Sequence, residues 1–199
     1  AAAGAMVLVN TIVLVRGELG LDESHVAVAL GVFGGGSMLA ALALPGLLDR
    51  LQDRPVMIGG AVVLLSGLLA IAGVIEFYSL SLGALIAAWF LIGIGYSTVL
   101  TPSGRLLRRS AHPEDRPAVF AAQFALSHAC WLVTYPLAGW LITRFDPTVA
   151  LGCLATLAAG GTLLATTLWP KGEVDDLEHR HDSLPADHPH IHDSRSHSH

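Results

Sequence analysis

The chain has 199 residues, of which 53% are apolar and only 14% are charged, whereas a soluble domain carries roughly 25% charged residues. Two uncharged stretches, residues 26–48 and 117–143, each exceed the roughly 20 residues that cross the hydrocarbon core of a bilayer. The net charge of −5 arises mainly in the last part of the chain, so the body is nearly neutral. An ordinary soluble domain is excluded, and so is a secreted disulfide scaffold, because Cys130 and Cys153 both lie inside apolar runs.

Six apolar segments follow in chain order, at residues 1–15, 25–48, 56–75, 80–103, 117–142 and 148–169. Residues that favour helix starts stand before or near the start of four of them: Asp22 and Ser24, Asp53 and Pro55, Ser79 and Ser81, Asp146 and Pro147. We therefore predict an all-α membrane protein in which residues 1–170 form six transmembrane helices.

The first segment opens at Ala1 without a methionine or a basic region, so it does not resemble a cleavable signal peptide. We expect a helix already in progress, in the distal portion of a longer protein.

The basic residues divide unevenly between alternate connections. Nine follow the second, fourth and sixth segments (Arg50, Arg54, Arg105, Arg108, Arg109, Arg116, Lys171, Arg180 and Arg195), and two, Arg16 and Arg144, follow the first and fifth. The positive-inside bias then predicts that the even-numbered exits and the C-terminus are cytoplasmic, and that Ala1 begins on the same side. We expect the cluster at residues 105–109 to serve topology and lipid headgroup contact.

Polar side chains are confined to certain segments. The third and sixth carry no charged, amide or imidazole side chain between residues 56 and 75 or between 148 and 168, so we expect them to face lipid. The polar residues of the others should point inward, because an amide or imidazole in hydrocarbon is costly. They are Asn10 in the first segment, Tyr96, Ser97, Thr98 and Thr101 in the fourth, and Gln123, Ser127, His128 and Tyr135 in the fifth.

The second segment contains small residues at close spacing: Gly31, Gly34, Gly35, Gly36 and Ser37. Such residues let two helix backbones approach closely, and we expect close packing here. Glycine alone does not distinguish a static interface from a sliding one.

The connection after the second segment carries the motif Asp49-Arg50-x-x-x-Arg54. Its carboxylate can pair with a neighbouring arginine or helix N-terminus, although an ordinary charged loop would show the same pattern. The motif resembles the loop signature of the major facilitator superfamily, which recurs between the second and third helices of each six-helix half. Gln52 and Pro45 stand where that signature has glycine. With the six-helix spacing, residues 1–170 are similar to helices seven to twelve of such a transporter.

The resemblance implies alternating access, with substrate held near the midplane between two halves. It makes Asn10, Tyr96, Ser97, Thr98 and Thr101 candidates for the cavity lining, with Gln123 and His128 beside them, and Asp49, Arg50 and Arg54 candidates for a cytoplasmic gate. Asn10, Gln123 and a neutral His128 are equally consistent with bonds between helices, and His128 with proton coupling. None of these helices carries a membrane-buried Asp, Glu, Lys or Arg, so if protons drive transport, the acidic carrier would lie in the N-terminal half.

Residues 171–199 differ sharply in composition. They contain few large apolar residues and should be disordered. Seven histidines, with interleaved aspartates, could bind nickel, cobalt, zinc or copper weakly, although a solvated tail with tolerated histidines is the alternative. They are His179, His181, His188, His190, His192, His197 and His199. The tail resembles that of some metal-resistance exporters of the same superfamily.

Two functions follow as hypotheses. The first is a permease in the lipid bilayer that exports a small solute or metal cation in exchange for protons. The second is a membrane-anchored protein that buffers metal through its tail. No catalytic pair, cofactor motif or nucleic-acid-binding pattern is present, so we expect no enzyme, no cofactor and no nucleic acid partner. Abundant arginine, alanine and glycine favour a bacterial inner membrane.

Overall fold

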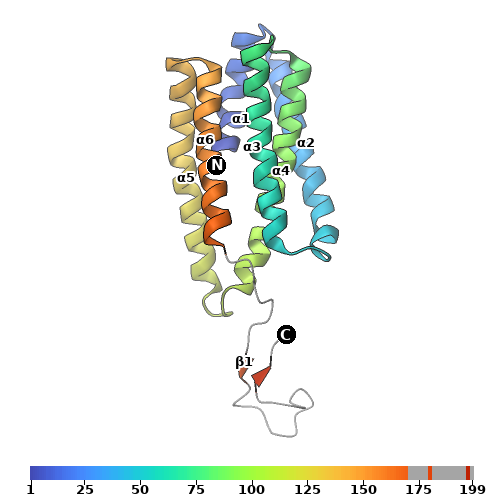
Figure 1. The fold of residues 1–199 in the computed structure, drawn as a ribbon, viewed down its shortest axis with the longest axis vertical. Helices are drawn as coiled ribbons and strands as arrows, with labels where there is room; N and C mark the ends of the chain where they lie inside the picture. Colours follow the sequence, from blue (N-terminus) through green and yellow to red (C-terminus); the bar gives the residue numbers. More distant parts are fainter. Residues whose placement is uncertain (170–178, 181–195, 198–199) are drawn as a thin grey trace. The chain divides into compact units, whose positions relative to one another are not determined.

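The structure, a computed structural model, describes residues 1–169, 179–180 and 196–197. The chain divides into two compact units, Ala1–Thr166 and Thr167–His199. The first holds the helices (Figure 1): α1 (Ala2–Ile12), η1, a π-helix (Val13–Glu18), α2 (Glu23–Leu48), α3 (Asp53–Phe77), α4 (Leu82–Arg109), α5 (Arg116–Arg144) and α6 (Pro147–Leu168, which ends in the second unit). In the second unit, β1 (His179–Arg180) pairs antiparallel with β2 (Ser196–His197), with His179 opposite His197.

Polar side chains fix the starts of three helices. Asp22 caps α2 by accepting hydrogen bonds from the backbone N–H of Ser24 at 3.0 Å and of His25 at 3.4 Å. Ser81 caps α4 through the N–H of Ala84, and Asp146 accepts from the N–H of Val149 at the start of α6. These caps satisfy donors that a helix leaves open at its first turn, and they confirm three of the predicted starts.

α3 begins differently from the prediction. Its N-cap is Gln52, which makes no capping bond through its side chain, and Asp53 is already its first helical residue. The carboxylate of Asp53 is used elsewhere, by arginines of α4.

α4 lies between α2 and α3, at glycine contacts on both sides. On the α2 side, Gly36 faces the backbone of Phe90 and Gly93 faces the backbone of Phe33. On the α3 side, a Cβ on Gly95 would lie 2.8 Å from the carbonyl oxygen of Gly60. Close backbone approach of this kind maximises van der Waals contact where the surrounding solvent is also apolar.

The glycine run of α2 is thus only partly used for packing. Gly36 is buried against α4, but a Cβ on Gly31, Gly34 or Gly35 would meet no atom within 4 Å. Within the described residues these three glycines make no close helix contact, because they lie on the side of α2 that faces away from α4.

α1 is the most buried helix and occupies the interior of the bundle. Residues 2–7, Asn10 and Thr11 are all buried. α1 packs chiefly against α5, and the indole N–H of Trp89 in α4 donates to the hydroxyl of Thr11 at 2.7 Å. The core therefore forms around α1, where α4 and α5 meet it.

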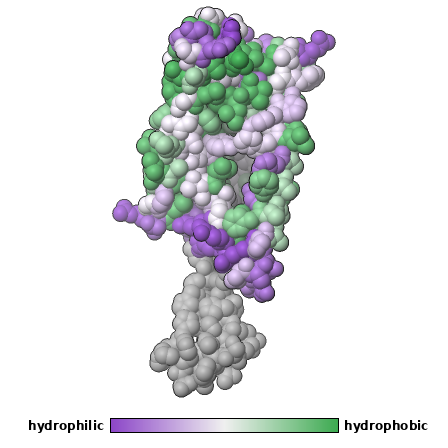
Figure 2. Space-filling view, turned by 180° about the vertical axis from the view of Figure 1, so that it is seen from behind, coloured by the Kyte–Doolittle hydropathy of each residue, from purple (hydrophilic) through white to green (hydrophobic). Residues whose placement is uncertain are grey.

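The outside of the bundle is apolar along its length and polar at its ends. Figure 2 shows hydrophilic residues gathered at both ends of the first unit and apolar or weakly polar residues between them. Large side chains such as Leu42, Leu132 and Leu168 are mostly exposed, which an aqueous surface would not favour but a bilayer would. α3 and α6 also keep exposed leucines and valines.

Five helices, α2 to α6, are long and apolar enough to cross a membrane. The prediction of an all-helical membrane bundle is confirmed for this unit. α1 and η1 together span residues 2–18, and α1 begins partway along the bundle (Figure 1), so the first of the six predicted spans is shorter than the other five.

Candidate functional site

The bundle has two charged ends, and at one of them two partly exposed arginines pair with a buried carboxylate. The carboxylate of Asp53, only 3% exposed, accepts hydrogen bonds from Arg105 Nε at 3.0 Å and Nη2 at 2.6 Å. A further pair joins Asp53 to Arg109 Nη1 at 3.5 Å, and Arg105 Nη1 donates to the carbonyl oxygen of Leu48 at 3.0 Å. We call Asp53, Arg105 and Arg109 the charged cluster.

Local sequence explains how the charged cluster forms. α4 continues to Arg109, six residues beyond the apolar segment, and passes through Pro102. Arg105 and Arg109 are four residues apart and so share one helix face. That face meets the first turn of α3, where a carboxylate is also favoured by the helix dipole. The two-point contact of Arg105 with Asp53 ties the ends of α2, α3 and α4 together.

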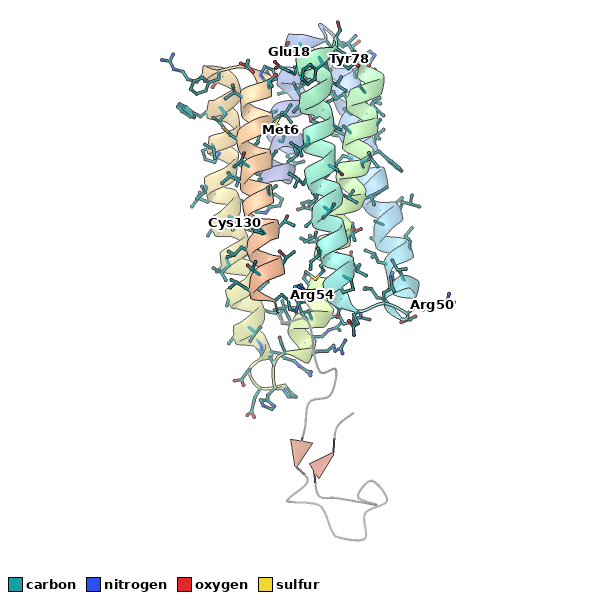
Figure 3. The ribbon with its side chains drawn as sticks, viewed as in Figure 1. Met6, Glu18, Arg50, Arg54, Tyr78 and Cys130 are labelled. Carbon is teal, nitrogen blue, oxygen red and sulfur yellow. The ribbon has the colours of Figure 1, made fainter. Side chains whose placement is uncertain are left out.

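The predicted gate residues lie at the same end but outside this cluster. Asp49 and Arg50 are exposed and form no ion pair within the described residues. Figure 3 shows Arg50 extending away from the bundle, whereas Arg54 lies toward the end of α6, where its Nη2 donates to the carbonyl oxygen of Thr166 at 3.1 Å. The spacing of the Asp49-Arg50-x-x-x-Arg54 motif therefore indicated the charged end of the bundle, but it did not indicate that the buried carboxylate there is that of Asp53.

The predicted cavity-lining residues are distributed over several surfaces. Asn10 is fully buried, and its Nδ2 donates to the carbonyl oxygen of Ala138 in α5 at 3.2 Å, while its Oδ1 has no partner among the described residues. Thr98 packs against Gly60 of α3. Ser97 is buried, with its hydroxyl 3.3 Å from that of Thr101, which is exposed. The structure does not bring these residues together in one site.

Gln123 and His128 lie on the exposed part of α5. The Nδ1 of His128 lies 2.8 Å from the carbonyl oxygen of Phe124, and the two rings stack at 3.8 Å. These contacts are within α5 and not between helices. Only Thr134, Ala138, Leu141 and Ile142 of α5 are buried, so the polar half of this helix is open on the surface of the bundle.

Near the middle of the bundle, four aromatic residues from three helices are in contact. Phe33 of α2 meets Tyr96 of α4 edge to face at 5.7 Å, Tyr96 meets Trp131 of α5 at 6.5 Å, and Trp131 meets Tyr135 at 4.9 Å. We call these residues the aromatic cluster. Only Tyr96 was a predicted site residue. The spacing of Trp131 and Tyr135, four apart on one helix, was the available signal.

The opposite end of the bundle carries small exposed pairs. Arg16 bonds Glu23 at 2.8 Å, and the carboxylate of Asp22 lies 2.8 Å from Nδ1 of His25. Hydrogen bonds from Ser24 and then from His25 lower the pKa of Asp22 to about 2. Gly20, with φ of 64°, makes the turn that precedes this cap.

The metal prediction falls almost entirely outside the described residues. His181, His188, His190, His192 and His199 lie there, and for His179 and His197 only the strand pairing is described. Among the described residues, no three His, Cys, Asp or Glu side chains form a group that could hold a metal ion.

A bundle of long apolar helices with an apolar outer wall and charged ends defines a multi-pass membrane protein. The chain matches the family model of the Major Facilitator Superfamily over residues 1–187, and it belongs to this family. Its members are membrane transporters and not enzymes, so this chain is part of a transporter that sits in a lipid bilayer and binds small solutes. No curated protein matches the chain.

Proposed function

We propose that residues 1–170 are helices seven to twelve of a secondary active transporter of a bacterial inner membrane, which works by alternating access and exports a small solute or a metal cation in exchange for protons. One observation carries this proposal. α5 holds Gln123, Ser127 and His128 within its apolar length, yet this stretch is exposed in the bundle. Polar side chains at membrane depth face protein or a water-filled pathway. The N-terminal half of the same transporter supplies that second surface.

The test is proton-coupled flux in proteoliposomes that contain the intact transporter. An imposed pH gradient should drive solute uptake, and a protonophore should abolish it. His128→Ala and Gln123→Ala should reduce flux at unchanged folding, whereas the control Leu164→Ala, on the exposed face of α6, should not. Flux that ignores both the gradient and the α5 variants would overturn the proposal.

Deletion of residues 172–199 separates the transporter from a metal-buffering protein. Transport should persist without this segment, because the pathway lies between the helices. Loss of function on deletion, with the helices still folded, would favour buffering through the histidines.

A further inference from the structure

We propose that the aromatic cluster is a binding site for a planar, uncharged heteroaromatic solute with hydrogen-bond acceptors. This inference rests on the proposed function and names the class of substrate. It excludes a bare metal cation as the ligand of this site.

The first argument is the state of the polar tips. The hydroxyls of Tyr96 and Tyr135 and the indole N–H of Trp131 make no hydrogen bond within the described part of the chain, and none is fully buried. Trp89 differs, because its N–H donates to Thr11. Tyr and Trp combine an apolar ring with a polar tip, and in this cluster the rings pack together while the three tips stay accessible. The cluster therefore offers three hydrogen-bonding groups to a solute that stacks on its rings.

The second argument is position. Tyr96 is near the middle of α4, and Trp131 and Tyr135 are near the middle of α5. The ring of Tyr96 is held against Gly4 of α1, where a Cβ would lie 3.2 Å from its Cε2. The cluster is thus fixed from one side at mid-bundle depth, the level at which transporters of this kind hold substrate.

The third argument is charge. The helices that carry the cluster have no Asp, Glu, Lys or Arg at residues 24–48, 82–104 or 117–143. His128, three residues before Trp131, is an imidazole, but its Nδ1 lies 2.8 Å from the carbonyl oxygen of Phe124 and its ring stacks on Phe124. A divalent cation prefers several carboxylate, carbonyl or imidazole ligands together, and a charge buried without a counter-charge is costly. Aromatic walls instead favour stacking on a flat ring, and the three donors favour its acceptor atoms.

The experiment is equilibrium dialysis of coumarin, a neutral planar lactone, against the intact transporter in nanodiscs. Tyr96→Phe and Tyr135→Phe remove only a hydroxyl, and each should weaken binding by up to about tenfold. Trp131→Ala should weaken it by about tenfold or more, through lost ring contact. Trp140→Phe is the matched control, because Trp140 pairs edge to face with Phe145, the C-cap residue of α5, outside the cluster. This variant should bind coumarin with unchanged affinity.

Absence of saturable coumarin binding, equal affinity in all four variants, or displacement of coumarin by Ni²⁺ would overturn the site. The proteoliposome assay separates this failure from failure of the proposed function. If proton-coupled flux persists in the three cluster variants, the binding site is refuted and the proposed function stands. If coumarin binds at the cluster but flux is not coupled to protons, the transport mechanism is refuted and the binding site stands.

Discussion

At Asp53, a carboxylate that is 3% exposed is held by Arg105, which is 31% exposed, and by Arg109. Asp53→Ala leaves the partly buried guanidinium of Arg105 without its ion-pair partner. We expect the free energy of unfolding to fall by about 3 kcal/mol or less. This is the lower end of the range for breaking a buried ion pair, because Arg105 keeps some contact with solvent. Urea unfolding in detergent micelles, followed by circular dichroism, measures this loss.

Asp49→Ala is the control for that experiment. Asp49 is four residues away, exposed, and unpaired within the described residues, so its removal should leave stability unchanged. If Asp49→Ala costs as much as Asp53→Ala, the charged cluster is not what fastens the ends of α2, α3 and α4.

The two aspartates also show why the sequence located the charged end but not its centre. Asp49 and Asp53 both flank the same short connection, and burial of either depends on where α4 ends. The apolar segment predicted that α4 ends near residue 103, because the arginines that follow are charged. In the structure the helix continues to Arg109. The four-residue spacing of Arg105 and Arg109 was visible, but its partner lay on another helix.

Asn10 separates an interhelical bond from a ligand role. Its Nδ2 donates to the carbonyl oxygen of Ala138 and to the sulfur of Met6, while Oδ1 has no partner among the described residues. Replacing it with leucine therefore loses these two bonds and also removes an unsatisfied buried acceptor. Because these effects oppose each other, Asn10→Leu should change the thermal midpoint in micelles only slightly. Asn10→Asp, which cannot donate when ionised, should lower it substantially. A normal midpoint for Asn10→Leu together with lost flux would instead assign Asn10 to the substrate.

At the scale of helices, α2 and α4 meet through Gly93. A methyl group at Gly93 would run into the backbone of Phe33, whereas one at Gly35 would meet open space. Gly93→Ala should therefore destabilise the bundle by about 1–3 kcal/mol through overpacking. Gly35→Ala should be neutral or stabilising by up to about 1 kcal/mol, because alanine has the higher helix propensity. Unfolding in urea compares the two, and equal effects would contradict the observed interface.

The cap of α2 depends on pH with a definite sign. The folded-state pKa of Asp22 is depressed to about 2 from its ordinary 3.8, so its stabilising contribution is present above pH 3.8 and is lost as pH falls through about 2. The difference in thermal midpoint between the native chain and Asp22→Asn should narrow as pH falls from 4 toward 2. A difference that does not vary with pH would show that the carboxylate's charge is not involved.

Helix existence followed from the sequence because apolar runs of membrane length have few alternatives. Packing did not follow, since the glycine run of α2 gives no indication of which side meets a neighbour. Of the glycines in this run, only Gly36 meets α4 closely, and the tightest contact from the α4 side is made by Gly93. The aromatic cluster was missed for the same reason, because its contacts join three helices.

At the scale of the whole molecule, the two ends of the bundle differ in charge, and this difference predicts which end faces the cytoplasm. Glu18 and Tyr78 lie at one end of the bundle and Arg50 and Arg54 at the other (Figure 3), and the basic residues favour the Arg50 end as cytoplasmic. With Cys130 and Cys153 replaced by alanine, single cysteines at Arg50→Cys and Tyr78→Cys report each end, since both positions are exposed. A membrane-impermeant maleimide should label Tyr78→Cys in spheroplasts and Arg50→Cys only in inside-out vesicles. The reverse pattern would invert the bundle and place the charged cluster on the outer face, where it could not serve a cytoplasmic gate.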